Sequence, residues 1–122
     1  KPGILKSEYE RLVRVFAAGE LVKLGLITPA QVAEKPSDPP IVRKYYMHGC
    51  SHFLGLDVHD VGEANPVVLP GMVFTVEPGI YIAEEGIGIR LENDVLIGEI
   101  ENIDLLGDVP LLPDDIERLM AR

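Results

Sequence analysis

Two short stretches decide the fold of this chain: residues 70–82 are PGMVFTVEPGIYI, and residues 86–97 are GIGIRLENDVLI. Both are rich in β-branched residues and are bounded by Gly and Pro, which is the pattern of β-strands separated by turns. The strands that we predict from this pattern, including one that follows it, cover 72–77, 80–83, 87–97 and 99–105.

Helix signals lie on either side of these strands. Ser7 and Glu10 have the spacing of a capping box and predict an amphipathic helix that ends at about Leu24. The other predicted elements are a short helix from Thr28 to about Glu34, a Pro-rich loop at 35–40, and a helix after Pro113. Helices, then strands, then a helix predict an α+β fold with a largely antiparallel sheet.

The composition narrows the classes of partner. A chain of 122 residues fits one domain, and its net charge of −9 argues against nucleic acid and anionic membranes. No apolar run approaches the roughly 20 residues of a membrane span. We therefore expect a cationic partner, such as a metal ion or a peptide amino terminus. Cys50 is the single cysteine, which excludes a disulfide framework and predicts a cytoplasmic protein.

All three histidines lie within residues 46–62, YMHGCSHFLGLDVHDVG. His48 and His52 have the spacing of a zinc-binding helix, but Gly49 replaces the glutamate of that motif and disfavours a helix. A hydrogen-bonded core histidine is the alternative interpretation for one or two of them. Three histidines so close together, flanked by glycines, favour a site over that alternative.

Charged residues within the strands are further candidates. Glu77 ends a nearly apolar strand, where an unpaired carboxylate is costly unless a cation or hydrogen bonds hold it. Arg90 and Glu92 share one strand face, opposite Ile89 and Leu91, and a solvated outer face is an equally good interpretation of that pair. Histidine with carboxylates is a mixed nitrogen and oxygen ligand set, suited to manganese, cobalt or zinc.

These stretches together resemble a known family. HGCSHFLGLDVHDVG at 48–62, followed by residues 70–82 and 86–97, is similar to the C-terminal half of the catalytic domain of Xaa-Pro aminopeptidases. These enzymes belong to the pita-bread metallopeptidases. Residues 1–27 resemble the helix that precedes the histidine motif, so the resemblance covers nearly the whole chain. It implies that residues 1–122 are the C-terminal portion of such a domain, with the upstream half missing.

The resemblance also implies a ligand set. His52, Glu77 and Glu92 would be metal ligands, with Glu92 bridging two manganese ions, or cobalt or zinc in their place. Glu77 would also shuttle the proton of the attacking water. The family takes its remaining ligands from two aspartates upstream of the first histidine, whereas only Asp38 precedes His48 here. We therefore expect at most one ion in this chain.

The pocket residues follow from the same resemblance. His48 and His59 would contact the substrate and hydrogen-bond its carbonyl oxygen as the tetrahedral species forms. Arg90 would orient Glu92 and His59. Phe53 would lie near the pocket that receives proline.

The implied function is a metal-dependent aminopeptidase that removes the first residue from peptides with proline in second position. The missing upstream half and a second copy of the chain are the expected protein partners, because half a domain leaves its sheet uncovered. By itself the chain should be inactive. Two alternatives remain open: a prolidase acting on Xaa-Pro dipeptides, and a metal-free module that binds peptides without catalysis.

Overall fold

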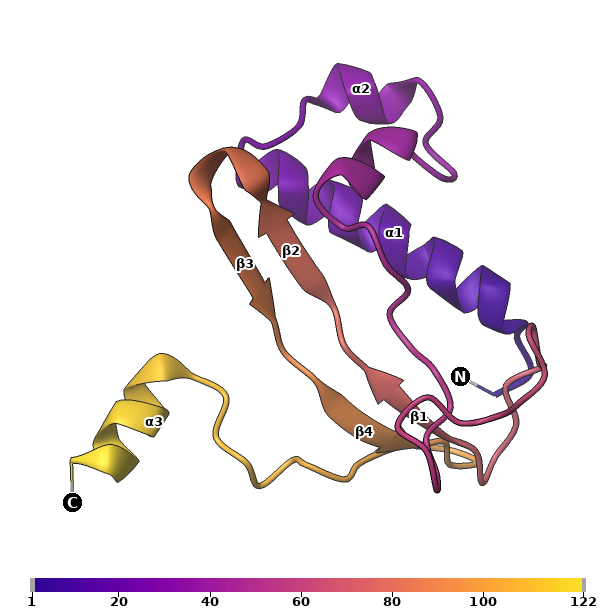
Figure 1. Cartoon of the computed structure of the whole chain (residues 1–122). Helices are drawn as coiled ribbons and strands as arrows, with labels where there is room; N and C mark the ends of the chain where they lie inside the picture. Colours follow the sequence, from indigo (N-terminus) through magenta and orange to yellow (C-terminus); the bar gives the residue numbers. More distant parts are fainter. Residues whose placement is uncertain (1, 122) are drawn as a thin grey trace.

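The computed structural model describes residues 2–121 and consists of a helical layer packed beside a long antiparallel ribbon (Figure 1). The elements in chain order are α1 (Lys6–Lys23), α2 (Pro29–Ala33), the 3₁₀ helix η1 (Pro40–Lys44), β1 (Val73–Val76), β2 (Gly79–Ile82), the 3₁₀ helix η2 (Ala83–Glu85), β3 (Ile87–Arg90), β4 (Asn93–Leu96), β5 (Ile103–Asp104) and α3 (Pro113–Met120). Every strand pair among the described residues is antiparallel, so the α+β prediction is confirmed.

The ribbon is built from two strand pairs that follow one another. β1 pairs with β4, β2 pairs with β3, and β5 adds a short edge beside β4. The register is the same in both pairs, and continued through the break between them it places Glu77 opposite Glu92. A single strand at 87–97 was therefore a wrong prediction. The ladder is interrupted at this point because Pro78 has no N–H to donate.

Successive side chains along each strand of the ribbon point to opposite faces, so the ribbon has two distinct faces. Ile80 and Ile82 of β2 pack against the helical core, together with Val76 of β1. Because successive side chains point to opposite faces, Glu77 and Arg90 lie on the other side of the ribbon, away from α1. The helical layer thus covers one face and leaves the charged face open.

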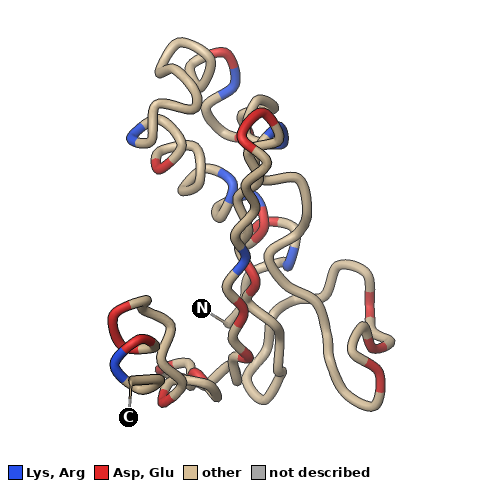
Figure 2. The backbone as a smooth tube through the Cα atoms, turned by 60° about the vertical axis from the view of Figure 1, so that its left-hand side comes forward, with Lys and Arg blue, Asp and Glu red and all other residues tan. Residues whose placement is uncertain are grey.

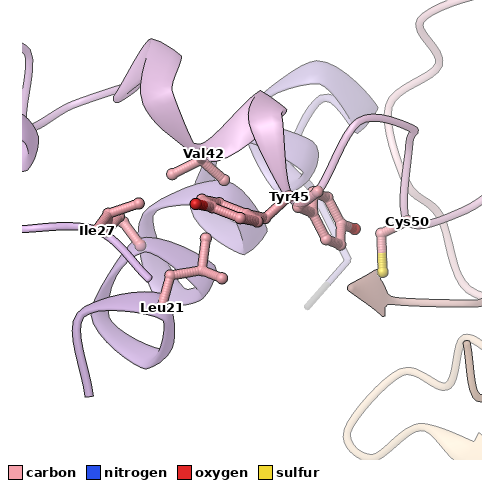
Figure 3. Close-up of a cluster of buried hydrophobic side chains, with 7 residues drawn as sticks. Leu21, Ile27, Val42, Tyr45 and Cys50 are labelled. Atoms are coloured by element: carbon pink, nitrogen blue, oxygen red, sulfur yellow. The ribbon is translucent and has the colours of Figure 1, made fainter. Parts of the chain in front are cut away.

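A buried apolar cluster holds the helical layer together (Figure 3). It brings residues of α1 and η1 against the segment that precedes the second histidine. Its members are Ala18, Leu21, Ile27, Val42, Tyr45, Tyr46 and Cys50. The backbone N–H of Tyr81 donates to the carbonyl of Tyr45 at 2.9 Å, which fixes β2 to this layer.

The start of α1 differs from the prediction. The helix begins at Lys6, and its N-cap residue Leu5 has no side chain that could cap it. Asn65 Oδ1 instead accepts the backbone N–H of Ser7 in the first turn at 2.8 Å. Ser7 and Glu10 do not form a capping box, because the Glu10 carboxylate turns inward and binds the backbone of Cys50 and Ser51. The second helix does start as predicted, since Thr28 and Gln31 form both bonds of a capping box. Its end and the helix after Pro113 also agree with the prediction, whereas the loop predicted at 35–40 stops at residue 39 because the 3₁₀ helix η1 begins at Pro40.

The predicted strand at 99–105 is reduced to Ile103–Asp104. A tight turn at residues 98–101 replaces its first half. The backbone approaches itself so closely there that a Cβ on Gly98 would collide with the carbonyl oxygen of Glu101. Such an approach requires glycine, and it removes residues 99–102 from the ladder.

Charge is unevenly distributed along the chain (Figure 2). Most Lys and Arg residues precede Tyr45, whereas most Asp and Glu residues follow it. The half of the chain that carries the ribbon is consequently acidic. Within residues 2–121, no helix has the length and apolar character that crossing a membrane requires.

Candidate metal centre

Three side chains that are far apart in sequence meet on the open face of the ribbon. His52, Glu77 and Glu92 each offer one ligand atom, and these atoms all lie within 4.8 Å of one another. His52 Nε2 is 3.2 Å from Glu77 Oε1, and the Glu77 side chain is only 12% exposed. The structure therefore brings together the three residues that the resemblance implied as ligands.

Hydrogen bonds orient the imidazole of His52. Its Nδ1 lies 2.7 Å from the carbonyl oxygen of Phe53, so Nδ1 carries the proton and donates it to that oxygen. This bond selects the tautomer whose Nε2 lone pair faces Glu77. A lone pair opposite a carboxylate is favourable only with a proton or a cation between them. In metal-binding histidines, the ring nitrogen that does not bind the metal usually donates its proton to an acceptor such as a backbone carbonyl, as Nδ1 does here.

The two carboxylates come from opposite strands at the break in the ribbon. Like charges directly across an antiparallel pair destabilise it. Arg90 offsets part of this repulsion, since its guanidinium nitrogens lie 3.6 Å from Glu77 Oε2 and 3.6 Å from Glu92 Oε2. The Arg90 side chain is 50% exposed, so water screens much of its charge. A negative surplus remains at the centre of the site.

This donor set fits a divalent cation. Nitrogen and oxygen ligands bind such ions at about 2.0–2.2 Å, so two ligands of one ion can be up to roughly 4.4 Å apart. Small side-chain rotations would thus bring His52, Glu77 and Glu92 onto a single ion. One imidazole and two carboxylates are the ligands expected for zinc, cobalt or manganese, and not for a structural thiolate site.

The other two histidines have different surroundings. His59 packs its ring edge-on against His52, with the ring centroids 4.3 Å apart, so it borders the three ligands. His48 lies beside β2, where its Nε2 is 2.9 Å from the hydroxyl of Tyr81 and its Nδ1 is 2.7 Å from the carbonyl of Gly49. Only one of the two predicted substrate histidines therefore contacts the cluster directly.

Phe53 packs on the core beneath the site. Its ring lies 4.6 Å from that of Phe74, and a Cβ on Gly62 would collide with it. Gly62 thus permits the loop that carries His59 to fold back over Phe53.

Thr75, Tyr81 and Glu10 were not predicted as site residues. The hydroxyl oxygen of the buried Thr75 accepts the backbone N–H of His52 at 3.0 Å and lies 3.5 Å from Glu77 Oε1. A polar residue inside the apolar run of β1 was the available signal for Thr75. For Tyr81 and Glu10 the sequence carries no such signal, because their partners lie far away along the chain.

Known proteins resemble the chain in both sequence and structure. Xaa-Pro aminopeptidase of Escherichia coli K12 is 43% identical over 90% of this chain, and that of Haemophilus influenzae is 39% identical over 95%. The chain spans 27% and 29% of the length of these relatives.

Solved structures agree with these relatives. E. coli aminopeptidase P, in its zinc-substituted form with product and in complex with the inhibitor Pro-Leu, superposes with a TM-score of 0.80 at 39% identity. The match covers 99% of this chain and 30% of that protein. The pita-bread fold expected from the sequence is therefore confirmed.

The sequence profile of metallopeptidase family M24 matches residues 1–99. This range contains all the residues of the cluster and the helical layer beneath them. The chain therefore belongs to metallopeptidase family M24.

Proposed function

We propose that this chain supplies the histidine and glutamate ligands of an Xaa-Pro aminopeptidase, a hydrolase that removes the first residue from peptides with proline in second position. The observation that carries the proposal is the convergence of His52, Glu77 and Glu92 on the open face of the ribbon. The named relatives support this substrate class. We further propose manganese as the metal and the cytoplasm as the location.

The ligands of a complete two-ion centre divide unequally in this proposal. His52, Glu77 and Glu92 would hold the first ion, and three protein ligands suffice for a catalytic type of site. Glu92 alone would contact the second ion, because the aspartates that complete it are not in this sequence. We propose that a preceding segment of a longer protein provides them, so residues 1–122 would act as the C-terminal portion of the catalytic domain.

When bound, a divalent cation lowers the pKa of its water and polarises the scissile carbonyl. Glu77 would accept the proton of the attacking water at its carboxylate and pass it to the leaving amine. His59, beside His52, and His48 would donate hydrogen bonds to the carbonyl oxygen as negative charge develops on it. Arg90 would hold both carboxylates in place, and Phe53 would border the proline pocket.

A chimera tests this proposal. The segment of E. coli Xaa-Pro aminopeptidase that aligns with this chain is replaced by residues 1–122, and release of the first residue from an Xaa-Pro peptide is measured with excess manganese. We expect turnover by the chimera, none by its Glu77→Gln variant, and none by the 122-residue chain alone.

The matched control for this chimera is Glu85→Gln, an exposed glutamate outside the cluster. An inactive chimera that is folded and binds manganese would refute the proposal, and so would turnover by the isolated chain. Assays of an Xaa-Pro dipeptide beside longer Xaa-Pro peptides decide between a prolidase and an aminopeptidase.

A further inference from the structure

A buried carboxylate on α1 lies directly behind the candidate metal centre. Glu10 is 8% exposed, and its two carboxylate oxygens accept the backbone N–H groups of Cys50 at 2.9 Å and Ser51 at 3.2 Å. Lys6, one turn earlier, is 3.5 Å from the same carboxylate. Glu10 therefore joins the helix to a segment that lies 40 residues further along the chain.

The segment held by Glu10 is connected through the backbone to two of the three ligands, Glu77 and His52. The carbonyl oxygen of Cys50 accepts the backbone N–H of Glu77 at 2.8 Å. His52 follows directly after Ser51, and its backbone exchanges hydrogen bonds with Thr75 at 3.0 and 3.1 Å. One carboxylate thus fixes the backbone on which the spacing of His52 and Glu77 depends.

Helix packing alone does not require a glutamate at this position. Burying a carboxylate is costly, and two backbone N–H groups left without acceptors are costly as well. Glu10 resolves both costs together, because residues 50 and 51 lie outside any helix or strand and, within the described residues, Glu10 is the acceptor of both N–H groups. The bidentate contact restricts translation and rotation of the segment more than one bond would.

From this geometry we propose that Glu10 is a positioning residue that sets the distance between His52 and Glu77, and so the affinity of the site for a divalent cation. The proposal rests on the proposed function, since it assigns a metal to these ligands. Within the described residues, the carboxylate of Glu10 binds the backbone of Cys50 and Ser51 and the ammonium of Lys6, and it forms no hydrogen bond with the side chains of the three ligands. Its effect is transmitted through the backbone of residues 50–52.

Manganese affinity of the 122-residue chain is the first measurement, by titration calorimetry on the native sequence and on Glu10→Gln. A glutamine can accept only one of the two N–H groups and presents its own NH₂ to the other. We expect the variant to bind manganese about tenfold more weakly, the lower end of the loss that follows removal of an outer-shell partner. Affinity within twofold of the native value would overturn the proposal.

Two controls separate positioning from general loss of stability. Glu20→Gln removes a glutamate of the same helix that pairs with Lys23 at the surface, and it should leave the affinity unchanged. Leu21→Ala opens the buried cluster away from the site and should lower the denaturation midpoint at least as much as Glu10→Gln. We expect Leu21→Ala to retain native affinity, and an equal loss of affinity in Leu21→Ala would overturn the proposal.

A metal-free measurement keeps this test independent of the proposed function. In NMR hydrogen exchange, Glu10→Gln should speed exchange of the Glu77 amide by about tenfold and shift the ring resonances of His52, whereas Leu21→Ala should not do so selectively. The chimera decides the proposed function, whereas unchanged exchange and unchanged ring shifts would overturn the positioning role, whether or not the native chain binds manganese. If Glu10→Gln does not fold, Glu10→Asp replaces it in the same measurements. This variant keeps the carboxylate but shortens the side chain by one methylene, and the same outcomes support or overturn the proposal.

Discussion

Arg90 lies at the point where two opposed carboxylates come together. Its guanidinium reaches both Glu77 and Glu92 at 3.6 Å, yet half of the side chain is in solvent. An exposed ion pair of this kind contributes little to stability, on the order of 0–1 kcal/mol. The carboxylates therefore remain poorly compensated without a cation. Two carboxylates held together at a cost in stability are typical of a site that binds a ligand.

Glu92→Gln should affect stability and metal binding in different ways. The substitution removes the charge opposite Glu77, so the metal-free free energy of unfolding should not fall, while manganese affinity should drop at least about tenfold because a ligand is lost. Urea denaturation and titration calorimetry on the same samples check both effects. The matched control is Glu85→Gln, which should change neither quantity. A destabilised variant with native affinity would contradict this expectation.

The buried Tyr46 and the half-buried Tyr9 provide a pH-dependent prediction. Burial, reinforced by the nearby Cys50 sulfur, raises the pKa of Tyr9 and of Tyr46 well above the ordinary value of 10.0. Tyr9 donates to Cys50 Sγ at 3.3 Å, and the Tyr46 hydroxyl is buried with no hydrogen-bond partner among the described residues. The neutral phenols therefore stabilise the fold at every pH below 10, and this stability is lost as the pH rises above it.

We expect both phenols to resist ionisation until the protein unfolds. Absorbance at the tyrosinate band, followed beside circular dichroism, should show part of the change coinciding with loss of structure above pH 10. Tyr9→Phe should reduce that late component. Reversible ionisation of all four tyrosines near pH 10, with an unchanged circular dichroism spectrum, would be the opposite result.

At the scale of elements, charged pairs connect the short helices to the rest of the layer. Arg14 of α1 binds Asp38 in the Pro-rich loop at 2.8 Å, and both side chains are largely buried. Lys44 of η1 binds Glu84 of η2 at 2.5 Å, which joins the helical layer to the hairpin of β2 and β3. The loop at 35–39 thus has a fixed position although it forms neither helix nor strand.

The Arg14–Asp38 pair predicts acid sensitivity. The hydrogen bond from Arg14 holds the pKa of Asp38 below its ordinary 3.8, so the stabilisation is complete above that pH and is lost as the pH falls further. Asp38→Asn should therefore lower the free energy of unfolding by about 1 kcal/mol at pH 7, with little difference near pH 2. Urea denaturation at both pH values measures this, with Asp57→Asn in the exposed histidine loop as control. An equal effect at both pH values would show that charge is not the cause.

At the scale of the whole molecule, the helical layer is narrower than the ribbon. Ile80 of β2 is packed against the helices, whereas its cross-strand partner Ile89 of β3 is 62% exposed. Leu91 and Ile87 are also exposed beside it. The predicted uncovered face is thus restricted to the β3 side, because α1 already covers Val76 and β2. Figure 1 shows the C-terminal helix α3 apart from the ribbon.

This apolar strip should cause self-association of the isolated chain. Sedimentation velocity over a concentration series should show a dimer or larger species, and Ile89→Gln should shift the equilibrium toward monomer. Leu56→Gln, which changes an even more exposed apolar residue in a loop, is the control and should have no such effect. A native chain that stays monomeric at every concentration would count against the prediction.

Sequence patterns were sufficient wherever neighbouring residues decide the structure. The strands at 73–76 and 79–82, the capped helix at 29–33 and the final helix all follow from local propensity and turn residues. The errors arose where distant segments compete for the same groups. Glu10 accepts the backbone N–H of Cys50 instead of capping its own helix. The predicted strand at 87–97 is divided into two strands at the point where Pro78 lies opposite it in the ribbon.

The sequence by itself determined the chemistry of this protein: which residue types are present, that three histidines and two glutamates lie in strand-and-turn contexts, and that their order resembles a metallopeptidase. Tertiary structure alone decided the geometry. Only strand pairing places Glu77 opposite Glu92, and only packing of α1 brings Glu10 behind His52. The physical reason is that a site of this kind is made by long-range hydrogen bonds and register, neither of which is encoded in any single short stretch of the chain.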